Sequence, residues 1–435
     1  MPIVNQVHAV ILPTELLAEI FLLCLPDVTH QPETHSYVVD QPRTLRRSEA
    51  PLLVASACKR WREVATSTPR LWLSLDLNRD LGPVSANTGV VSSWLSRSHP
   101  YPLSLVLNRH CPPRAVDEIK RHCERWGAVE LRIHENDPRV FDDVRGRLPC
   151  LEKLYLCLEF EPPHVVESFA DAHRLKQVFL EAGTTELGSV VLPWHQLTSL
   201  TCMYFSDIEC VEILKKCPAL VDCCLIGCST DRSMELMKVF SPIVLRRITS
   251  LTLCEATVLD TLRSLELPSL RDLQLELGED GDVEILVSFL TRSSCQLESI
   301  CLWQVDDQDL LRCLPVLASP VTLEIRTCNQ LLTDDFFRLL KDRTILPKLR
   351  ELDIDVNLTN WPTRDWTDSL MRDMILSRCI GCENLSDHLE VFRLLYKPPE
   401  GEDAPELLAF ASELDPLLSP QMLEFEISAN SDHWV

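Results

Sequence analysis

The sequence predicts an α/β fold in which a helical N-terminal module precedes an irregular solenoid of strand–helix repeats that curves into a horseshoe. Near the N-terminus, apolar residues recur at helical spacing between Pro13 and Pro26. From residue 71 onward, the pattern Leu-x-x-Leu-x-Leu recurs with a mean spacing of about 27 residues. The chain has 11 glycines and no Gly-x-Gly pair, so the phosphate-binding loops of nucleotide-binding α/β domains are not expected.

The composition of the 435-residue chain is that of a globular protein, with 46% apolar and 25% charged residues. Its formal net charge of −23 disfavours binding to nucleic acid or to an anionic membrane, because both need a basic footprint on the protein. We therefore expect neither as a partner.

The 19 cysteines are an odd number and make up about 4% of the chain, below the roughly 8–10% of disulfide scaffolds. Many lie in apolar, strand-like contexts, where a free thiol behaves as a small hydrophobe. The apolar stretch before Pro26 lacks the basic residues of a signal peptide, and no run of about 20 apolar residues predicts a transmembrane helix. These features favour a reducing compartment, cytoplasmic and/or nuclear.

Three short elements are expected in the N-terminal module. A helix over 13–26 is followed by a polar loop or insertion at about 27–47. A second helical stretch covers 50–65, and Trp72 begins the first strand. Such short amphipathic pieces cannot bury a large core alone, so they need a partner surface from the rest of the chain or from another protein.

The repeat array is expected over 71–435, with one short strand in each unit. A strand alternates its side chains, so the last two apolar residues of each pattern point into one core. The middle apolar residue marks each strand: Leu75, Leu105, Leu131, Leu154, Val178, Leu200, Cys223, Leu251, Leu273, Ile300, Leu323, Leu352, Phe392 and Phe425. Helical stretches are expected between strands at 165–172, 208–216, 283–290, 334–340 and 370–377. This period is typical of leucine-rich repeats; the alternative, another type of α/β domain, needs longer loops and glycine-rich turns.

The ordered motif of the N-terminal module is more specific than its helices. It reads Leu12-Pro13-x-Glu15-Leu16-Leu17-x-Glu19-Ile20-Phe21, then Pro51-Leu52-Leu53, Cys58-Lys59-Arg60-Trp61-Arg62 and Pro69-Arg70-Leu71-Trp72. The string resembles an F-box, in particular that of basidiomycete fungi, which has an insertion after its first helix. The resemblance covers residues 12–77 of an expected module of 1–77. Ala57 departs from it, where the family usually has valine. The alternative is an ordinary helical cap on the repeats.

The resemblance implies a function in protein recognition. Proteins with an F-box and leucine-rich repeats are similar to substrate receptors of SCF-type cullin–RING ubiquitin ligases, in which the F-box docks on a Skp-type adaptor and, through it, on cullin. The repeats then hold a protein substrate, while the recruited RING protein and conjugating enzyme transfer ubiquitin. Seven residues are implied to lie in or directly behind the adaptor-binding surface: Leu12, Pro13, Leu16, Ile20, Leu53, Trp61 and Trp72.

No catalytic or metal-binding signature is present in the sequence. The motifs His-Glu-x-x-His and Gly-x-Ser-x-Gly and the P-loop are missing, and the one Cys-x-x-Cys pair, Cys379 and Cys382, has no second pair at zinc spacing. We expect a protein that is not an enzyme and that binds no metal or cofactor. Two further hypotheses stay open: a non-degradative F-box scaffold, and a plain leucine-rich-repeat interaction protein that meets no adaptor.

The substrate surface is expected on the concave side of the horseshoe, at the positions that flank the inward leucines. In the last seven units these positions carry more acids than bases, which favours a substrate with a basic segment because a surface of one charge steers its opposite. The candidate contacts are Asp272, Glu276, Trp303, Glu324, Glu351, Asp353 and Asp355. The alternative is that these acids only keep exposed strands soluble.

Overall fold

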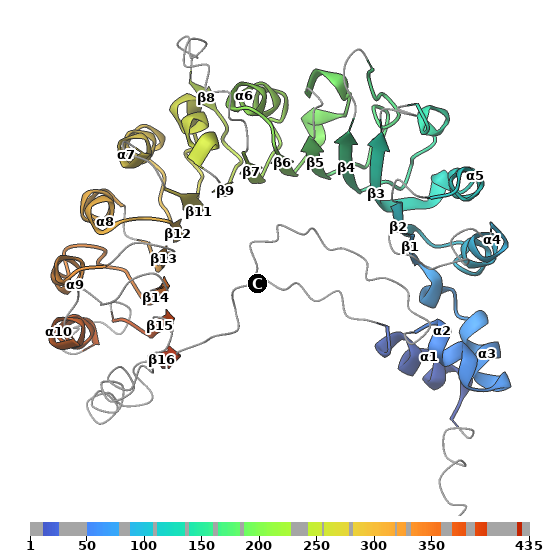
Figure 1. Cartoon of the computed structure of the whole chain (residues 1–435), viewed down its shortest axis with the longest axis horizontal. Helices are drawn as coiled ribbons and strands as arrows, with labels where there is room; N and C mark the ends of the chain where they lie inside the picture. The colour runs from blue at the N-terminus through green and yellow to red at the C-terminus, as the bar shows by residue number, and fades with distance from the viewer. Residues whose placement is uncertain are drawn as a thin grey trace, which may run out of the picture. The chain divides into compact units, whose positions relative to one another are not determined.

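The computed structural model describes residues 12–25, 50–77, 88–107, 111–134, 139–159, 164–182, 187–227, 242–254, 256–277, 282–317, 320–327, 332–357, 368–379, 388–397 and 424–428. The chain divides into two compact units, unit 1 (1–197) and unit 2 (198–435). Each has a mixed α/β structure in which parallel strands carry helices on one side (Figure 1). The insertion expected at about 27–47 lies outside the described residues.

Unit 1, in its described residues, begins with three helices and continues as a five-stranded parallel sheet. The helices are α1 (Thr14–Leu23), α2 (Leu52–Ala57) and α3 (Lys59–Thr66). The strands, in sheet order, are β1 (Ser74–Asp76), β2 (Leu103–Leu107), β3 (Trp126–His134), β4 (Lys153–Glu159) and β5 (Gln177–Ala182). The connections contain α4 (Thr88–Arg97), α5 (Pro113–Lys120) and the 3₁₀ turns η1 (Pro69–Trp72), η3 (Cys123–Arg125), η4 (Asp142–Val144), η5 (Leu187–Ser189) and η6 (Trp194–Gln196).

Unit 2 continues the alternation of strand and helix in its described residues. The strands of its main sheet, in sheet order, are β6 (Ser199–Met203), β7 (Asp222–Ile226), β9 (Ser250–Cys254), β11 (Asp272–Glu276), β12 (Ser299–Trp303), β13 (Thr322–Thr327), β14 (Glu351–Asn357), β15 (Val391–Lys397) and β16 (Glu424–Ser428). A separate pair consists of β8 (Ile243–Val244) and β10 (Leu265–Glu266). The helical elements are α6 (Asp207–Lys216), η8 (Ala256–Ser264), α7 (Asp282–Ser293), α8 (Asp307–Cys313), η9 (Leu314–Val316), α9 (Asp334–Lys341) and α10 (Asp368–Cys379).

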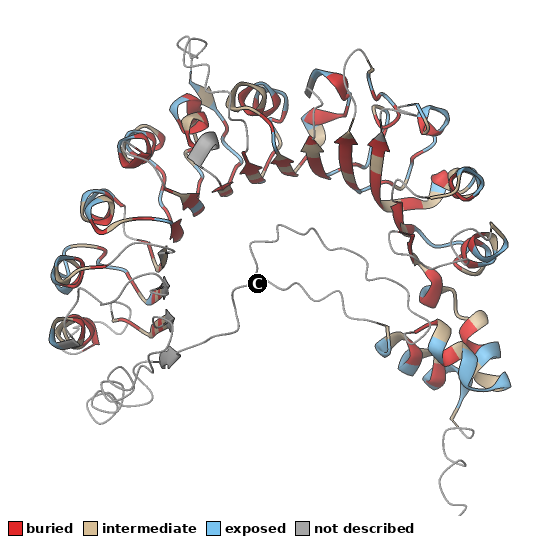
Figure 2. Cartoon of the chain, viewed as in Figure 1, coloured by how far each residue is buried: buried red, intermediate tan, exposed pale blue. Residues whose placement is uncertain are grey.

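The strands pair in a register that places the apolar marker residues side by side. In unit 1, Leu75 lies opposite Leu105, and Leu154 lies opposite Val178. In unit 2 one unbroken row runs through Leu200, Cys223, Leu251, Leu273, Ile300, Leu323, Leu352, Phe392 and Phe425. From Leu200 to Phe392 the residues of this row are buried, and Figure 2 shows the strands from β6 to β12 largely in red. The register confirms the predicted strand positions, including the two widely spaced ones at the C-terminal end.

Strand β3 departs from the predicted register. Leu105 pairs with Val129, so the first inward residue of β3 is Val129 and not the predicted marker Leu131. Val129, Leu131 and the next alternate residue are all apolar, so the sequence pattern admits both registers. The pairing with β2 skips Gly127, where an added Cβ would lie 3.2 Å from Cβ of Pro102. This irregularity at a close backbone approach selects the register.

Four of the five helices expected between strands are present, as α6, α7, α9 and α10. Side-chain caps show why some begin where they do: Ser206 and Glu209 form a capping box at α6, and the Thr333 hydroxyl accepts a hydrogen bond from the Asp335 amide at α9. The helix expected at 165–172 is wrong. Its β-branched start is extended, because Val166 bridges to Val190 and only turns follow.

The N-terminal module also differs from its prediction in two places. The single helical stretch expected over 50–65 is two helices, because Cys58 has extended backbone dihedrals and its thiol accepts a hydrogen bond from the Trp61 amide as the cap of α3. Trp72 ends the 3₁₀ turn that Pro69 begins, and so does not start a strand. A proline at the first position of a helical turn is favourable because its missing N–H needs no partner there.

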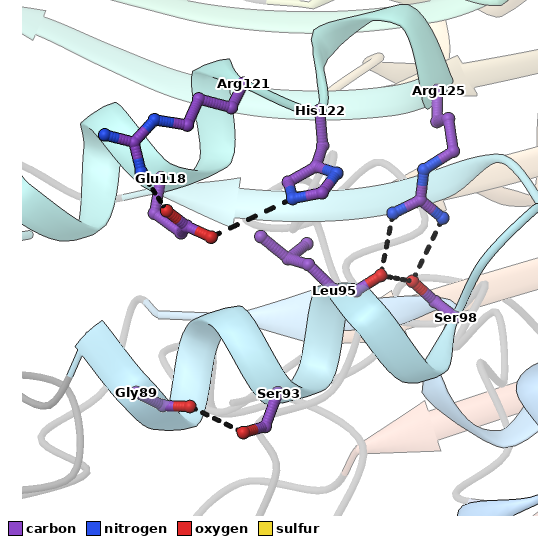
Figure 3. A network of polar contacts seen from close by, with 8 residues as sticks. All are labelled: Gly89, Ser93, Leu95, Ser98, Glu118, Arg121, His122 and Arg125. Carbon is purple, nitrogen blue, oxygen red and sulfur yellow. Dashed lines mark hydrogen bonds and ion pairs between the residues drawn. The ribbon is translucent and has the colours of Figure 1, made fainter.

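Several arginines near the C-terminal end of a helical element donate hydrogen bonds to backbone carbonyls at the C-terminal end of an earlier helical element. Arg125 donates from Nη2 to the Leu95 carbonyl at 2.8 Å, and from Nη1 to the Ser98 hydroxyl at 3.2 Å (Figure 3). These groups end helix α4, where the last carbonyls have no partner within the helix. A guanidinium group suits this role because it offers five donors in a fixed geometry.

The same contact recurs in other repeats. Arg292 at the end of α7 donates to the carbonyls of Leu262 and Leu265, at 2.6 and 3.0 Å from Nη2. Arg378 at the end of α10 is almost fully buried. Its guanidinium donates to four backbone carbonyls, those of Leu340, Asp342, Ile345 and Leu346. In unit 1, the Gln196 amide donates to the carbonyls of Ala172 and Leu175. We call these contacts the carbonyl clamps.

Arg378→Ala is expected to lower the free energy of unfolding by about 3–4 kcal/mol, because the carbonyls of Leu340, Ile345 and Leu346 lose the hydrogen bonds from its buried guanidinium. Chemical denaturation measures the loss. Arg338→Ala is the matched control, because Arg338 is exposed on α9 and its ion pairs with Asp334 and Asp335 contribute less than about 1 kcal/mol. Equal losses in the two variants would contradict the role of the clamp.

Candidate functional site

Helix α1 has a stripe of exposed apolar side chains. Leu16, Ile20 and Leu23 succeed one another at intervals of four and three residues and are 52%, 41% and 86% exposed. Leu17 and Phe21 are fully buried, and Ala18 and Leu22 are intermediate. Intervals of three and four residues place Leu16, Ile20 and Leu23 on one face of the helix. Helix α1 therefore has an apolar face that unit 1 leaves exposed.

The position of α1 is fixed by contacts with α3 and η1. The Phe21 ring packs on Trp61 with ring centroids 5.1 Å apart. The Arg60 guanidinium donates to the Leu12 carbonyl just before the helix, and Arg70 forms an exposed ion pair with Glu19 at 3.3 Å. The apolar stripe therefore lies on a helix that is held from its other side.

Trp72 lies in the interior of unit 1, at 1% exposure, and not on its surface. Its indole N–H donates to the Ala65 carbonyl at 2.7 Å, and its ring meets Trp94 edge to face with centroids 4.6 Å apart. The Arg97 guanidinium lies 4.5 Å from the ring centroid. Trp72 thus joins the helical module to α4, and of the two predicted places, in the surface or directly behind it, Trp72 lies behind the surface.

The other six residues predicted for the adaptor surface are at least partly exposed. Pro13, Leu16, Ile20 and Leu53 are exposed, whereas Leu12 and Trp61 are intermediate. Leu53 is 50% exposed on α2, which makes a second apolar exposure in the same module.

On each strand, the residues that alternate with the buried apolar row form what we call the polar face. In unit 2, Glu324, Asp353 and Arg393 lie side by side on this face in successive strands. Arg326 forms an ion pair with Glu324, and Arg393 Nη1 lies 3.3 Å from Asp353 Oδ2. Two of the predicted substrate-binding acids therefore already have a cation within the chain.

The other predicted contacts of unit 2 differ in how far they reach solvent. Asp272 and Glu351 are exposed, and the Glu276 carboxylate accepts a hydrogen bond from the Gln304 amide. Burial raises the pKa of Asp355 to about 6, helped by Glu324 and opposed by Arg326.

Trp303 is only 8% exposed, so it does not offer its ring to a partner as the sequence suggested. It lies in register between Glu276 and Arg326 on the neighbouring strands. Long side chains on both sides are able to cover a central aromatic ring in this way.

Unit 1 carries a denser polar cluster, which the sequence pattern did not single out. In one row across β1 to β5 lie Asp76, Val106, Glu130, Tyr155 and Phe179. Two residues further along the strands lie Arg132, Cys157 and Glu181, and Glu159 follows on β4. We call the residues of these rows the unit 1 cluster.

Most charges of the unit 1 cluster have partners within it. The Tyr155 hydroxyl donates to Glu181 Oε2 at 2.6 Å. The Arg132 guanidinium lies 3.3 Å from Glu159 and 3.9 Å from Glu181. The rings of Tyr155 and Phe179 stack in parallel, with centroids 4.2 Å apart and 9° between their planes.

Glu130 is the exception in this cluster. It is 8% exposed, and no hydrogen bond or ion pair joins its carboxylate to any residue in the described part of the chain. Burial, together with the Asp76 and Glu181 charges, raises the pKa of Glu130 to about 7 against the opposing effect of Arg132. Asp76 is 4% exposed, so two buried carboxyl groups share this part of the sheet.

The sequence contained these acids but not the signal that distinguishes them. Asp76, Glu130 and Glu181 occupy flanking positions of the repeat and are nearly balanced there by Arg132 and Lys153. A charge sum treats all flanking positions as equally solvated. It cannot show that two of these carboxyl groups are buried or that Arg132 is already paired.

Two absences hold for the described residues. No three His, Cys, Asp or Glu side chains are grouped so that they could hold a metal ion there. Cys379 is buried, and its predicted neighbour Cys382 lies outside the described residues. No helix in the same part of the chain has both the length and the apolarity to cross a membrane.

Comparison with known proteins gives no family for this chain. No family model and no curated protein matches its sequence. Among solved structures, a structural-genomics protein from Bacteroides fragilis is similar over 72% of this chain and 76% of its own, with 14% sequence identity and a TM-score of 0.36. Because this similarity is low, the function must be inferred from the residues of this chain.

Glu130→Gln is expected to change how stability depends on pH. The pKa of Glu130 is higher in the folded chain, at about 7, than its ordinary value of 4.5, so folding favours its protonated form. Its contribution to stability is therefore full below about pH 4.5 and is lost as the pH rises through about 7. Wild type is expected to lose about 2–3 kcal/mol relative to Glu130→Gln between pH 4.5 and 8.

Urea denaturation of both proteins at acidic and mildly basic pH measures this difference. Glu124→Gln removes a carboxylate of the same unit whose partner, Arg147, is 4.0 Å away at the surface, and is the control. Parallel pH profiles for wild type and Glu130→Gln would show that Glu130 titrates normally.

Proposed function

We propose that this chain is the substrate-recognition subunit of an SCF-type cullin–RING ubiquitin ligase. In this proposal residues 1–77 are an F-box that docks on a Skp-type adaptor and, through it, on cullin, and 71–435 are an irregular leucine-rich-repeat solenoid that holds a protein substrate. The chain positions its substrate and performs no catalysis. It acts in the cytoplasm and/or the nucleus, and its net charge of −23 makes nucleic acid and membrane surfaces poor partners.

The observation that carries the proposal is the exposed apolar stripe within the F-box-like motif. The motif contains adjacent apolar pairs, and in each pair one member supports the interior while the other is exposed: Leu17 with Leu16, and Phe21 with Ile20. Exposed leucine and isoleucine on a firmly held helix are suited to the apolar centre of a protein interface. An ordinary helical cap needs no such side chains, because its exposed face gains nothing from them.

The repeat spacing and the strand register support the solenoid part of the proposal. Each unit contributes one strand and a helical or turn segment, at a period of about 27 residues. The exposed acids Asp272 and Glu351 favour a substrate with a basic segment. Arg326 and Arg393 weaken the negative field there, because they form ion pairs with Glu324 and Asp353. A chain that binds both the adaptor and the substrate raises the effective concentration of the substrate at the conjugating enzyme.

The double variant Leu16→Ser/Ile20→Ser is expected to lose co-purification with the Skp-type adaptor. Truncation of central apolar side chains in an interface costs roughly 1–4 kcal/mol each, so the pair lowers affinity by at least about a hundredfold. Affinity pulldown and calorimetry with the purified adaptor measure the effect.

The matched control is Val165→Ser/Val316→Ser, which truncates two apolar side chains of similar exposure outside the F-box-like motif. The control variant is expected to bind the adaptor as wild type does. Undiminished adaptor binding by Leu16→Ser/Ile20→Ser would refute the docking surface, and a chain that never binds the adaptor would leave a plain repeat interaction protein.

A further inference from the structure

The geometry points to the unit 1 cluster as a binding site for a basic side chain of a partner protein, with arginine preferred over lysine. The inference rests on the proposed function in one respect, because it takes the partner protein to be the substrate. It adds Glu130 of unit 1 to the exposed acids of unit 2 as a place where basic chemistry is recognised.

The Glu130 carboxyl group lies on the polar face beside an apolar position of the neighbouring strand. Asp76 and Glu130 lie in register on β1 and β3, with Val106 of β2 between them. Strands are spaced by about 4.8 Å, so the two backbones are about 10 Å apart. The valine side chain has no polar atom, so β2 offers Glu130 no side-chain donor at this register position.

The cation already present in the cluster is engaged elsewhere. Arg132 pairs with Glu159 and Glu181, and Tyr155 gives its hydroxyl proton to Glu181. Glu130 is more than nine-tenths buried, and no described residue is joined to its carboxylate by a hydrogen bond or an ion pair. A buried carboxylate without a partner is costly, and a cation from another molecule removes that cost.

The aromatic pair of the cluster favours a guanidinium over an ammonium group. Tyr155 follows Glu130 in the same register row, and its ring is stacked on Phe179. A planar guanidinium can lie against an aromatic ring while two of its N–H groups donate to one carboxylate. The side chains of Glu159 and Glu181 are partly exposed, so the cluster reaches solvent at these residues.

The test uses the purified full-length chain and three short peptides: acetyl-Gly-Arg-Gly-amide, the lysine equivalent and the glutamine equivalent. Ligand-observed NMR measures their binding. The arginine peptide is expected to bind wild type at least about tenfold more tightly than Glu130→Gln. The lysine peptide binds more weakly than the arginine peptide, and the glutamine peptide does not bind. Binding of the arginine peptide is stronger at about pH 8 than at pH 5.5, where Glu130 is protonated.

Glu124→Gln, which removes one exposed carboxylate from the same unit, is expected to bind the arginine peptide as wild type does. Leu16→Ser/Ile20→Ser is also expected to bind it normally, so a failure of adaptor docking is distinguished from a failure of this site. Equal binding to wild type and Glu130→Gln overturns the inference. Equal binding of the arginine and glutamine peptides overturns it as well, as does the absence of binding to wild type at about 10 mM peptide.

Discussion

Parallel pairing of short strands, with one row of apolar side chains held in register, is the constraint on which the rest of each unit depends. No single strand of this chain can bury its leucines alone; each burial, worth roughly 1.5–3 kcal/mol per side chain, needs the strand before and the strand after it. Stacking repeats this way leaves helix ends with unpaired carbonyls. The carbonyl clamps of Arg125, Arg292 and Arg378 supply the missing donors between neighbouring repeats. The register of the apolar row and the carbonyl clamps thus both follow from the stacking of parallel repeats.

The strand positions were predictable because the period-2 and period-27 patterns both depend on residues that the core buries. The predictions failed where local chemistry competes with the pattern. Alternation in β3 allowed Leu131 or Val129 as the marker, and the close approach at Gly127 decided between them. The extended backbone at Cys58 divided a helical stretch that apolar spacing alone made continuous. The clamps were not predicted, because an arginine near a helix end has the same sequence signature whether it is solvated or bound to carbonyls some 30 residues away.

The surfaces were predictable only in part, because exposure and pairing are tertiary properties. The motif gave the exposed residues Leu16, Ile20 and Leu53, but it could not distinguish them from Trp72, which the α4 contact places in the interior. Charge counting favoured the C-terminal half of the chain, where Arg326 and Arg393 neutralise two of the acids. The same charge count did not single out Glu130, because it takes no account of burial. Our two proposals therefore assign the apolar surface of α1 to an adaptor and the buried carboxylate of the unit 1 cluster to a basic side chain of a partner.

The central claim is that the helical module is an adaptor-binding F-box, and stoichiometry tests it most directly. Native mass spectrometry of the full chain, co-expressed with a Skp-type adaptor, measures which complexes form. We expect a complex of one chain with one adaptor, which then takes up one cullin when cullin is added. A chain that stays free of adaptor under conditions in which a known F-box protein binds it would contradict this claim, and would leave the exposed stripe of α1 for a different partner.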